Sequence, residues 1–114
     1  MLPDKNRLKK KKDFEKVLKE GKGFKEGSLI LKVKKNKSKK LRFGFVVSRK
    51  VSKKAVVRNK IKRRLREVVK ERIKKIDKSF DIIIITLPNT ETKDFQELRR
   101  IIEKLFKKAG IANL

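Results

Sequence analysis

Apolar residues near the start of the chain recur at helical spacing. In the stretch DFEKVLKEG, which begins at Asp13, the side chains of Phe14, Val17 and Leu18 fall on one face of a helix. Gly21 follows, at the position where many helices end on a glycine. The pattern predicts a short amphipathic helix that packs one side against the rest of the protein.

Alternation of apolar and polar residues predicts strands further along. Residues 28–35, SLILKVKK, form one, and residues 41–48, LRFGFVVS, form another after the polar turn NKSKK. Because that turn is short, we expect these two strands to pair as a hairpin. A third run, FDIIIIT at residues 80–86, is too short and too β-branched for a good helix, so it predicts a buried central strand ended by Pro88.

Longer apolar stripes predict two further helices. One covers about residues 55–76, where apolar side chains recur at three- and four-residue steps. The other covers residues 94–110, with Asp94 near its start and Gly110 at its end as terminal signals. The stripe residues are Val57, Ile61, Leu65, Val68, Val69 and Ile76 in the first helix and Phe95, Leu98, Ile101, Ile102, Leu105 and Phe106 in the second.

A second face of the 55–76 helix is cationic. Its members are Asn59, Lys62, Arg63, Arg66 and Lys70. Acidic residues of this helix lie on a third sector, where other cations partly neutralise them. A charged run is commonly only a solvated helix surface. Solvation would be served equally well by a mixture of acidic and basic residues, whereas this face has no acid. The planar guanidinium groups of Arg63 and Arg66 also suit two-bond contacts with phosphates. The face therefore predicts phosphate binding, while for Asn59 a local cap and a contact to a base edge or ribose remain alternatives.

Net charge points to a polyanionic partner. The chain has 38 Lys and Arg residues against 13 Asp and Glu, a formal charge of +25, so the folded protein repels itself. Nucleic acid is favoured over an anionic membrane, because the longest aliphatic run, residues 82–85, is far short of the roughly 20 residues that span a bilayer. The basic start lacks the apolar segment of a secretory signal, so the cytoplasm is the expected location.

Missing residue types argue against an enzyme that works alone. The chain has no Cys and no His, which excludes thiolate chemistry and an imidazole base. Glu67 and Glu71 are one helical turn apart, but no compact carboxylate cluster that would hold two metal ions is evident. The 114 residues show no repeat or compositional break, so we expect a single domain covering residues 1–114.

The order Ala55, Val56, Arg58, Asn59, Lys62, Arg63, Arg66, Glu67 in the stretch AVVRNKIKRRLRE resembles the signature helix of the bacterial ribonuclease P protein subunit. The flanking segments RLKKKKDFEKVLKEG, RFGFVVSRK and FDIIIIT resemble the same family in the same order. This similarity implies an α/β (α+β) two-layer sandwich in the order helix, strands, helix, strand, helix. It also implies a left-handed βαβ crossover, whereas the general preference is right-handed.

The resemblance implies a function for the chain as well. Such proteins bind the catalytic RNA of ribonuclease P and the 5′ leader of precursor tRNA, and assist the endonucleolytic cut that forms the mature tRNA 5′ end. The RNA performs the chemistry with Mg²⁺ that it binds mainly itself, so no catalytic residue, protein-held metal, small-molecule substrate or membrane is expected for this chain. The alternative is a ribosomal-type or chaperone-like general RNA-binding protein.

Residue roles follow from the same resemblance. Phe14 corresponds to an aromatic position of the leader cleft, although a core role is equally compatible with its place in the sequence. Leu18 and Lys32 stand where some relatives have aromatic residues, and the loop before the helix lacks a glycine often found there. Residues 9–12 are either an RNA-binding arm or part of a flexible tail over about residues 1–12. The implied contacts to the catalytic RNA are Arg49, Lys50, Lys53, Lys54, Arg58, Asn59, Lys62, Arg63 and Arg66, and those of the leader cleft are Phe14, Leu18, Lys32 and Ser48.

Overall fold

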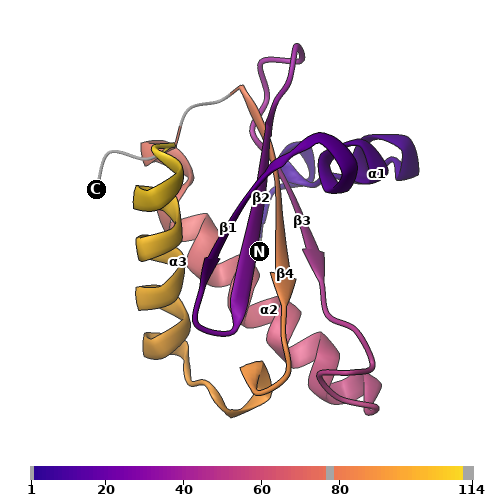
Figure 1. Ribbon diagram of the computed structural model, residues 1–114, viewed down its shortest axis with the longest axis vertical. Coiled ribbons are helices and arrows are strands. Elements are labelled where there is room, and N and C mark those ends of the chain that lie inside the picture. The colour runs from indigo at the N-terminus through magenta and orange to yellow at the C-terminus, as the bar shows by residue number, and fades with distance from the viewer. Residues whose placement is uncertain (1, 77–78, 112–114) are drawn as a thin grey trace.

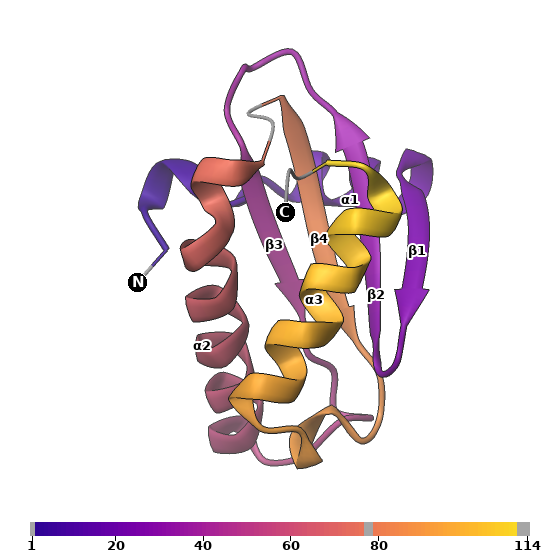
Figure 2. The same cartoon turned by 90° about the vertical axis from the view of Figure 1, so that its left-hand side faces the viewer.

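The computed structural model describes residues 2–76 and 79–111. In chain order its elements are η1 (Asp4–Asn6), α1 (Lys11–Glu20), β1 (Lys22–Glu26), β2 (Leu29–Lys35), β3 (Arg42–Val46), α2 (Ala55–Arg72), η2 (Ile73–Lys75), β4 (Phe80–Thr86), η3 (Thr90–Thr92) and α3 (Phe95–Ala109). The strands form one sheet in the order β1-β2-β4-β3, with α1 on one face and α2 and α3 on the other (Figures 1 and 2). The predicted α/β fold and order of elements are confirmed.

Strand β4 occupies the interior of the sheet, as its isoleucine run predicted. Strand β2 runs antiparallel to it on one side and β3 runs parallel to it on the other. Ile82 and Ile84 face a large core beneath α2 and α3, whereas Ile83 faces a smaller apolar cluster beneath α1. Burial on both faces explains why the sequence of β4 is almost continuously apolar.

The predicted hairpin between β2 and β3 is wrong. Strand β4 lies between them and pairs with both, so the loop at residues 36–41 crosses the start of β4. The backbone N–H of Asn36 donates to the carbonyl of Ser79 at 2.8 Å, which fixes the loop there. A strand buried on both faces also needs hydrogen-bond partners on both edges, and direct pairing of β2 with β3 would have left one edge of β4 unpaired.

Strand β1 is an element that the apolar pattern did not predict. Its sequence, KGFKE, contains a single apolar residue, Phe24, which is half-buried. The strand pairs antiparallel with β2 at the edge of the sheet, through a tight turn in which Gly27 has φ of +55°. An edge strand exposed to water needs little hydrophobicity, and the glycine of its turn was the available sequence signal.

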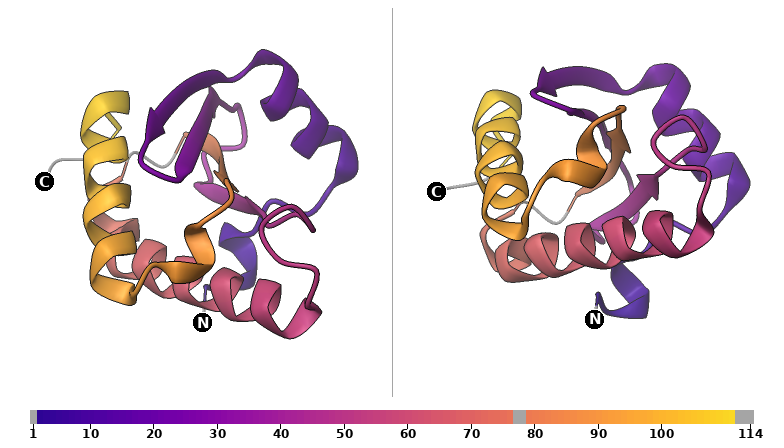
Figure 3. Two further views of the ribbon diagram at one scale, coloured as in Figure 1. Left: turned by 60° about the horizontal axis from the view of Figure 1, so that its bottom comes forward. Right: turned by 90° about the horizontal axis from the view of Figure 1, so that it is seen from below.

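The connection from β3 through α2 to β4 is a left-handed crossover. In Figure 1 both strands point downward with β4 to the left of β3, and Figure 3 shows from below that α2 lies behind the sheet. A right-handed connection of these parallel neighbours would place the helix on the opposite face. The handedness agrees with the expectation drawn from the family resemblance.

Helix ends follow the terminal signals with small shifts. Helix α1 begins at Lys11, two positions before Asp13, and ends where the N–H of Gly21 donates to the Val17 carbonyl at 2.8 Å. At the start of α3 the carboxylate of Asp94 accepts a hydrogen bond from the Glu97 N–H at 2.9 Å, and Gly110 follows its end with φ of +66°. The last residues of the predicted 55–76 helix form the separate turn η2.

The stripe of α2 packs as predicted. Ile61, Leu65, Val68 and Val69 are buried, and Val57 is half-buried against the same core. Fully burying one such aliphatic side chain contributes roughly 1.5–3 kcal/mol, so this stripe fixes which side of α2 faces water. Neither α2 nor any other helix within residues 2–76 and 79–111 is both long and apolar enough to cross a membrane.

Candidate nucleic-acid interface

Helix α2 presents its predicted cationic face to solvent. Asn59, Arg63 and Lys70 are exposed, while Lys62 and Arg66 are half-buried toward the edge of the sheet. The opposite side of the helix is anchored by its buried stripe, so these five side chains share the outer surface. The geometry produces an array of positive charge over several helical turns, which would attract a polyanionic backbone.

The loop before α2 continues this array. Ser48, Arg49, Lys50, Lys53 and Lys54 are all exposed. These residues lie between the end of β3 and the first turn of α2. The positive surface of α2 is therefore longer than the helix itself.

Serine side chains and one buried valine organise that loop, where a glycine might have been expected. The Ser48 Oγ accepts the N–H of Lys50 at 3.2 Å, and the Ser52 Oγ accepts the N–H of Lys54 at 3.2 Å. Between them Val51 is 6% exposed and packs in the large core. These local bonds define the turn geometry without a left-handed residue in the stretch 47–54, all of which lies in the described part of the chain.

Arg58 differs from the other predicted RNA contacts. Its Nη1 donates to the Ser52 carbonyl at 3.0 Å, and the side chain is half-buried. The guanidinium therefore ties the first turn of α2 to the preceding loop. Part of its hydrogen-bonding capacity remains for an RNA, because a guanidinium has five N–H donors.

A cleft of about 230 Å³ connects the cationic face of α2 with helix α1. Phe14 enters it from α1, and Lys62 and Arg66 enter it from α2. Of the described residues that line this cleft, none is acidic. The full lining is Arg7, Leu8, Lys9, Phe14, Phe43, Gly44, Phe45, Lys62 and Arg66.

The electrostatics of this cleft favour an anion. The guanidinium of Arg66 lies 5.9 Å from the centre of the Phe45 ring. Partial burial lowers the pKa of Arg66 from its ordinary value, and the nearby positive charge of Arg7 lowers it further. Both effects mean that positive charge is held here at an energetic disadvantage, which a bound phosphate would relieve.

Arg7 was not among the predicted site residues, and Lys9 was expected only as part of a basic arm or a flexible tail. They reach the cleft because the N-terminal segment lies along β3: the Leu8 N–H donates to the Phe43 carbonyl at 2.8 Å, and Asn6 Nδ2 donates to the Leu41 carbonyl at 2.7 Å. The basic run RLKKKK indicated positive charge, but the sequence contained no signal for this pairing with the edge of β3.

The predicted leader-cleft residues do not all meet in this cleft. Phe14 lines it and is half-buried, which accommodates both a core role and a surface role. Leu18 packs in the small cluster beneath α1. Lys32 on β2 is the register partner of Ile83 on β4, and so lies on the same face of the sheet. Ser48 lies in the loop after β3. Phe14 is therefore the member of the group that the structure places beside the cations of α2.

Comparison with known proteins identifies the family. A ribonuclease P family model matches residues 2–110. The ribonuclease P protein component of Synechocystis sp. is 40% identical over 111 residues, covering 96% of this chain and 90% of that protein. The RNase P protein of Staphylococcus aureus has a TM-score of 0.86 at 31% identity, covering 95% of this chain and 98% of that one. The protein from Thermotoga maritima has a TM-score of 0.80 at 34% identity, covering 90% and 96%. The chain belongs to the ribonuclease P protein family.

Proposed function

We propose that this chain is the protein subunit of a ribonuclease P in which α2 binds the catalytic RNA and the adjoining cleft holds the 5′ leader of precursor tRNA. The observation that carries the proposal is the cleft itself, because it joins Phe14 of α1 to Lys62 and Arg66 of α2. A strand of RNA that follows the cationic face passes directly into it. The protein acts in the cytoplasm on RNA partners.

Binding to the catalytic RNA is electrostatic in this account. Each phosphate neutralised by Lys or Arg releases condensed counterions, and a net charge of +25 supplies many such contacts. Exposed Arg63 offers a planar fork to a phosphate, and Asn59 beside it offers both a donor and an acceptor to a base edge or a ribose hydroxyl. The proposed contacts to the catalytic RNA are Arg49, Lys50, Lys53, Lys54, Arg58, Asn59, Lys62, Arg63 and Arg66.

The leader binds by a combination of stacking and charge. Phe14 is only half-buried, and an unpaired base can stack on an accessible ring for roughly 1–3 kcal/mol. The ammonium of Lys62 and the guanidinium of Arg66 line the same cleft and attract the phosphates on either side of that base. Leu18, Lys32 and Ser48 extend the surface but supply no ring.

Acidic side chains among the described residues offer no cluster for a metal ion. Within residues 2–76 and 79–111, no three His, Cys, Asp or Glu side chains are grouped closely enough to hold a metal ion. The Mg²⁺ that the cleavage requires is bound by RNA in this proposal. The protein contributes by placing substrate and by neutralising phosphates that would otherwise repel each other.

Binding of precursor tRNA and mature tRNA to the assembled ribonucleoprotein tests the proposal. Adding the protein to a bacterial ribonuclease P RNA should tighten binding of precursor tRNA much more than binding of mature tRNA. A general RNA-binding protein, which the charge alone would also permit, predicts equal effects on the two. Equal effects would therefore overturn the subunit role.

A further inference from the structure

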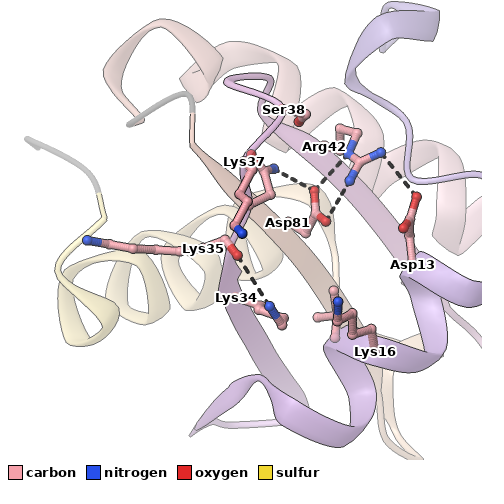
Figure 4. A pocket seen from close by; sticks show the side chains of 10 residues that line it. Asp13, Lys16, Lys34, Lys35, Lys37, Ser38, Arg42 and Asp81 are labelled. Carbon is pink, nitrogen blue, oxygen red and sulfur yellow. Dashed lines mark hydrogen bonds and ion pairs between the residues drawn. The ribbon is translucent and has the colours of Figure 1, made fainter.

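Beyond the cleft, an ion-pair network joins three elements on the other side of α1 (Figure 4). The guanidinium of Arg42 on β3 forms a two-bond pair with Asp81 on β4, with Nε to Oδ1 at 2.8 Å and Nη2 to Oδ2 at 2.8 Å. Its remaining Nη1 donates to the carboxylate of Asp13 on α1 at 3.2 Å. One side chain of the sheet thus makes a directional bond to α1.

The sheet end of this network is held by several hydrogen bonds. Asp81 is 5% exposed and is the register partner of Arg42 on the neighbouring parallel strand. Asn36 Nδ2 donates to the same carboxylate at 2.7 Å from the loop at residues 36–41. The hydrogen bond with Asp81 raises the pKa of Arg42, so the guanidinium stays charged at all working pH values. Two parallel bonds fix the plane of the guanidinium, and with it the direction in which Nη1 points.

Helix α1 has only light apolar anchoring around this bond. Val17 is fully buried, whereas Phe14 and Leu18 are half-buried in the small cluster that includes Leu8 and Ile83. A short helix held by three apolar side chains on one face has few contacts that oppose rotation about its axis. A bond from the sheet to Asp13, the residue before Phe14, opposes such a roll.

We infer that Arg42 is a positioning residue for leader binding: through Asp13 it sets the rotation of α1. That rotation holds the Phe14 ring against Gly44, so closely that a Cβ atom added to the glycine would clash with the ring. This inference rests on the proposed function for its consequence, but the contact between Phe14 and Gly44 can be followed without RNA. The network does not touch the leader. It determines where the stacking ring lies.

A measurement of folding stability alone would not reveal the positioning role of the Arg42–Asp13 pair. The side chains of Arg42 and Asp13 are 21% and 31% exposed, and such partly solvated pairs contribute little to folding. Replacing Asp13 with Asn also removes one negative charge, which by itself strengthens RNA binding. A loss of leader affinity in that variant would therefore run against the change in charge.

The test compares Asp13→Asn with Glu15→Gln. Glu15 lies on the same helix, is exposed, and pairs only loosely with Lys11 at 3.9 Å, so its variant makes the same charge change without touching Arg42. Two quantities are measured: the ratio of precursor to mature tRNA affinity in the ribonucleoprotein, and the amide chemical shift of Gly44 in the free protein, which senses the ring current of Phe14.

Asp13→Asn should lower the affinity ratio by about three- to fivefold, as loss of one partly exposed charged contact implies, and should shift the Gly44 signal. Glu15→Gln should leave both unchanged, with equal melting temperatures for the two variants. If the Gly44 signal of Asp13→Asn matches that of the wild type, the positioning role is wrong. If that signal moves while wild-type protein shows no preference for precursor, the positioning stands and the proposed function fails.

Discussion

The ring of Phe14 lies against the backbone of Gly44 so closely that a Cβ atom at position 44 would stand 2.4 Å from its Cε2 and 3.1 Å from its Cδ2. Gly44 belongs to the regular strand β3, so it is the absence of a side chain that matters here and not an unusual backbone conformation. Because Gly44 has no Cβ, the Phe14 ring can pack directly on the backbone of β3. This close contact places the Phe14 ring in the wall of the cleft.

Gly44→Ala should displace the Phe14 ring and weaken binding of precursor tRNA. Overpacking of this kind also destabilises a protein by roughly 1–3 kcal/mol, which a thermal melt will show. Gly23→Ala is the matched control, because a Cβ there meets only the flexible Lys32 side chain at 3.6 Å. Equal precursor affinities for the two alanine variants would show that the contact between Phe14 and Gly44 does not contribute to precursor binding.

Substitutions of Phe14 separate stacking from packing. Phe14→Leu keeps much of the apolar volume that fills the cluster beneath α1 but removes the aromatic face. We expect it to retain most of the stability while losing precursor affinity by roughly tenfold, in line with the energy of one base stack. Phe14→Ala should lose both. A leucine variant that binds precursor as well as the wild type would assign Phe14 to the core alone.

Arg63 and Arg66 should each govern the salt dependence of assembly with the catalytic RNA. Removing one phosphate contact reduces the slope of log affinity against log salt by roughly one unit. Arg63→Ala should do so without a change in melting temperature because Arg63 is exposed, whereas Arg66→Ala also loses its contact with Phe45. Arg100→Ala removes the same charge from the exposed side of α3 and should leave the slope unchanged. If all three alanine variants gave the same slope of log affinity against log salt, Arg63 and Arg66 would make no phosphate contact and would belong to an ordinary solvated surface.

A pH effect on stability is expected where α3 meets β1. Lys108 Nζ lies 2.7 Å from the carboxylate of Glu26, and the hydrogen bond and charge of Lys108 lower the pKa of Glu26 below its ordinary 4.5. A carboxylate with a lowered folded-state pKa stabilises the protein above the unfolded pKa and loses that contribution as pH falls through the folded pKa. The melting temperatures of wild type and Glu26→Gln should therefore differ slightly at pH 7 and converge in acid. A difference that stays constant with pH would contradict the pairing.

The sequence predicted those parts of the fold whose cause is local. The stripe from Ile61 to Val69 and the isoleucine run of β4 each have a strong periodic or compositional signature, and both were correct. The pairing of β2 with β4 was missed because it joins residues about fifty positions apart, and the short turn after β2 favoured a nearer partner. Strand β1 was missed because most of its side chains are exposed to water, so its sequence lacks the alternation of apolar and polar residues.

The site shows the same division. The cationic face of α2 follows from helical periodicity, so its members were predictable one by one. The cleft depends on how three separate segments approach one another, and Arg7 joins Arg66 only because the N-terminal segment pairs with β3. The bond from Arg58 to the Ser52 carbonyl likewise could not be inferred from a pattern of charges. Family resemblance supplied the roles, and the structure supplies the distances.

The decisive measurement of the subunit role is single-turnover cleavage of a precursor tRNA by bacterial ribonuclease P RNA at low Mg²⁺. It is made with and without this protein and at several salt concentrations. We expect a large stimulation of cleavage that diminishes with salt and is lost when the 5′ leader is shortened. Binding to the RNA with no stimulation of cleavage, or a stimulation that does not depend on the leader, would contradict it.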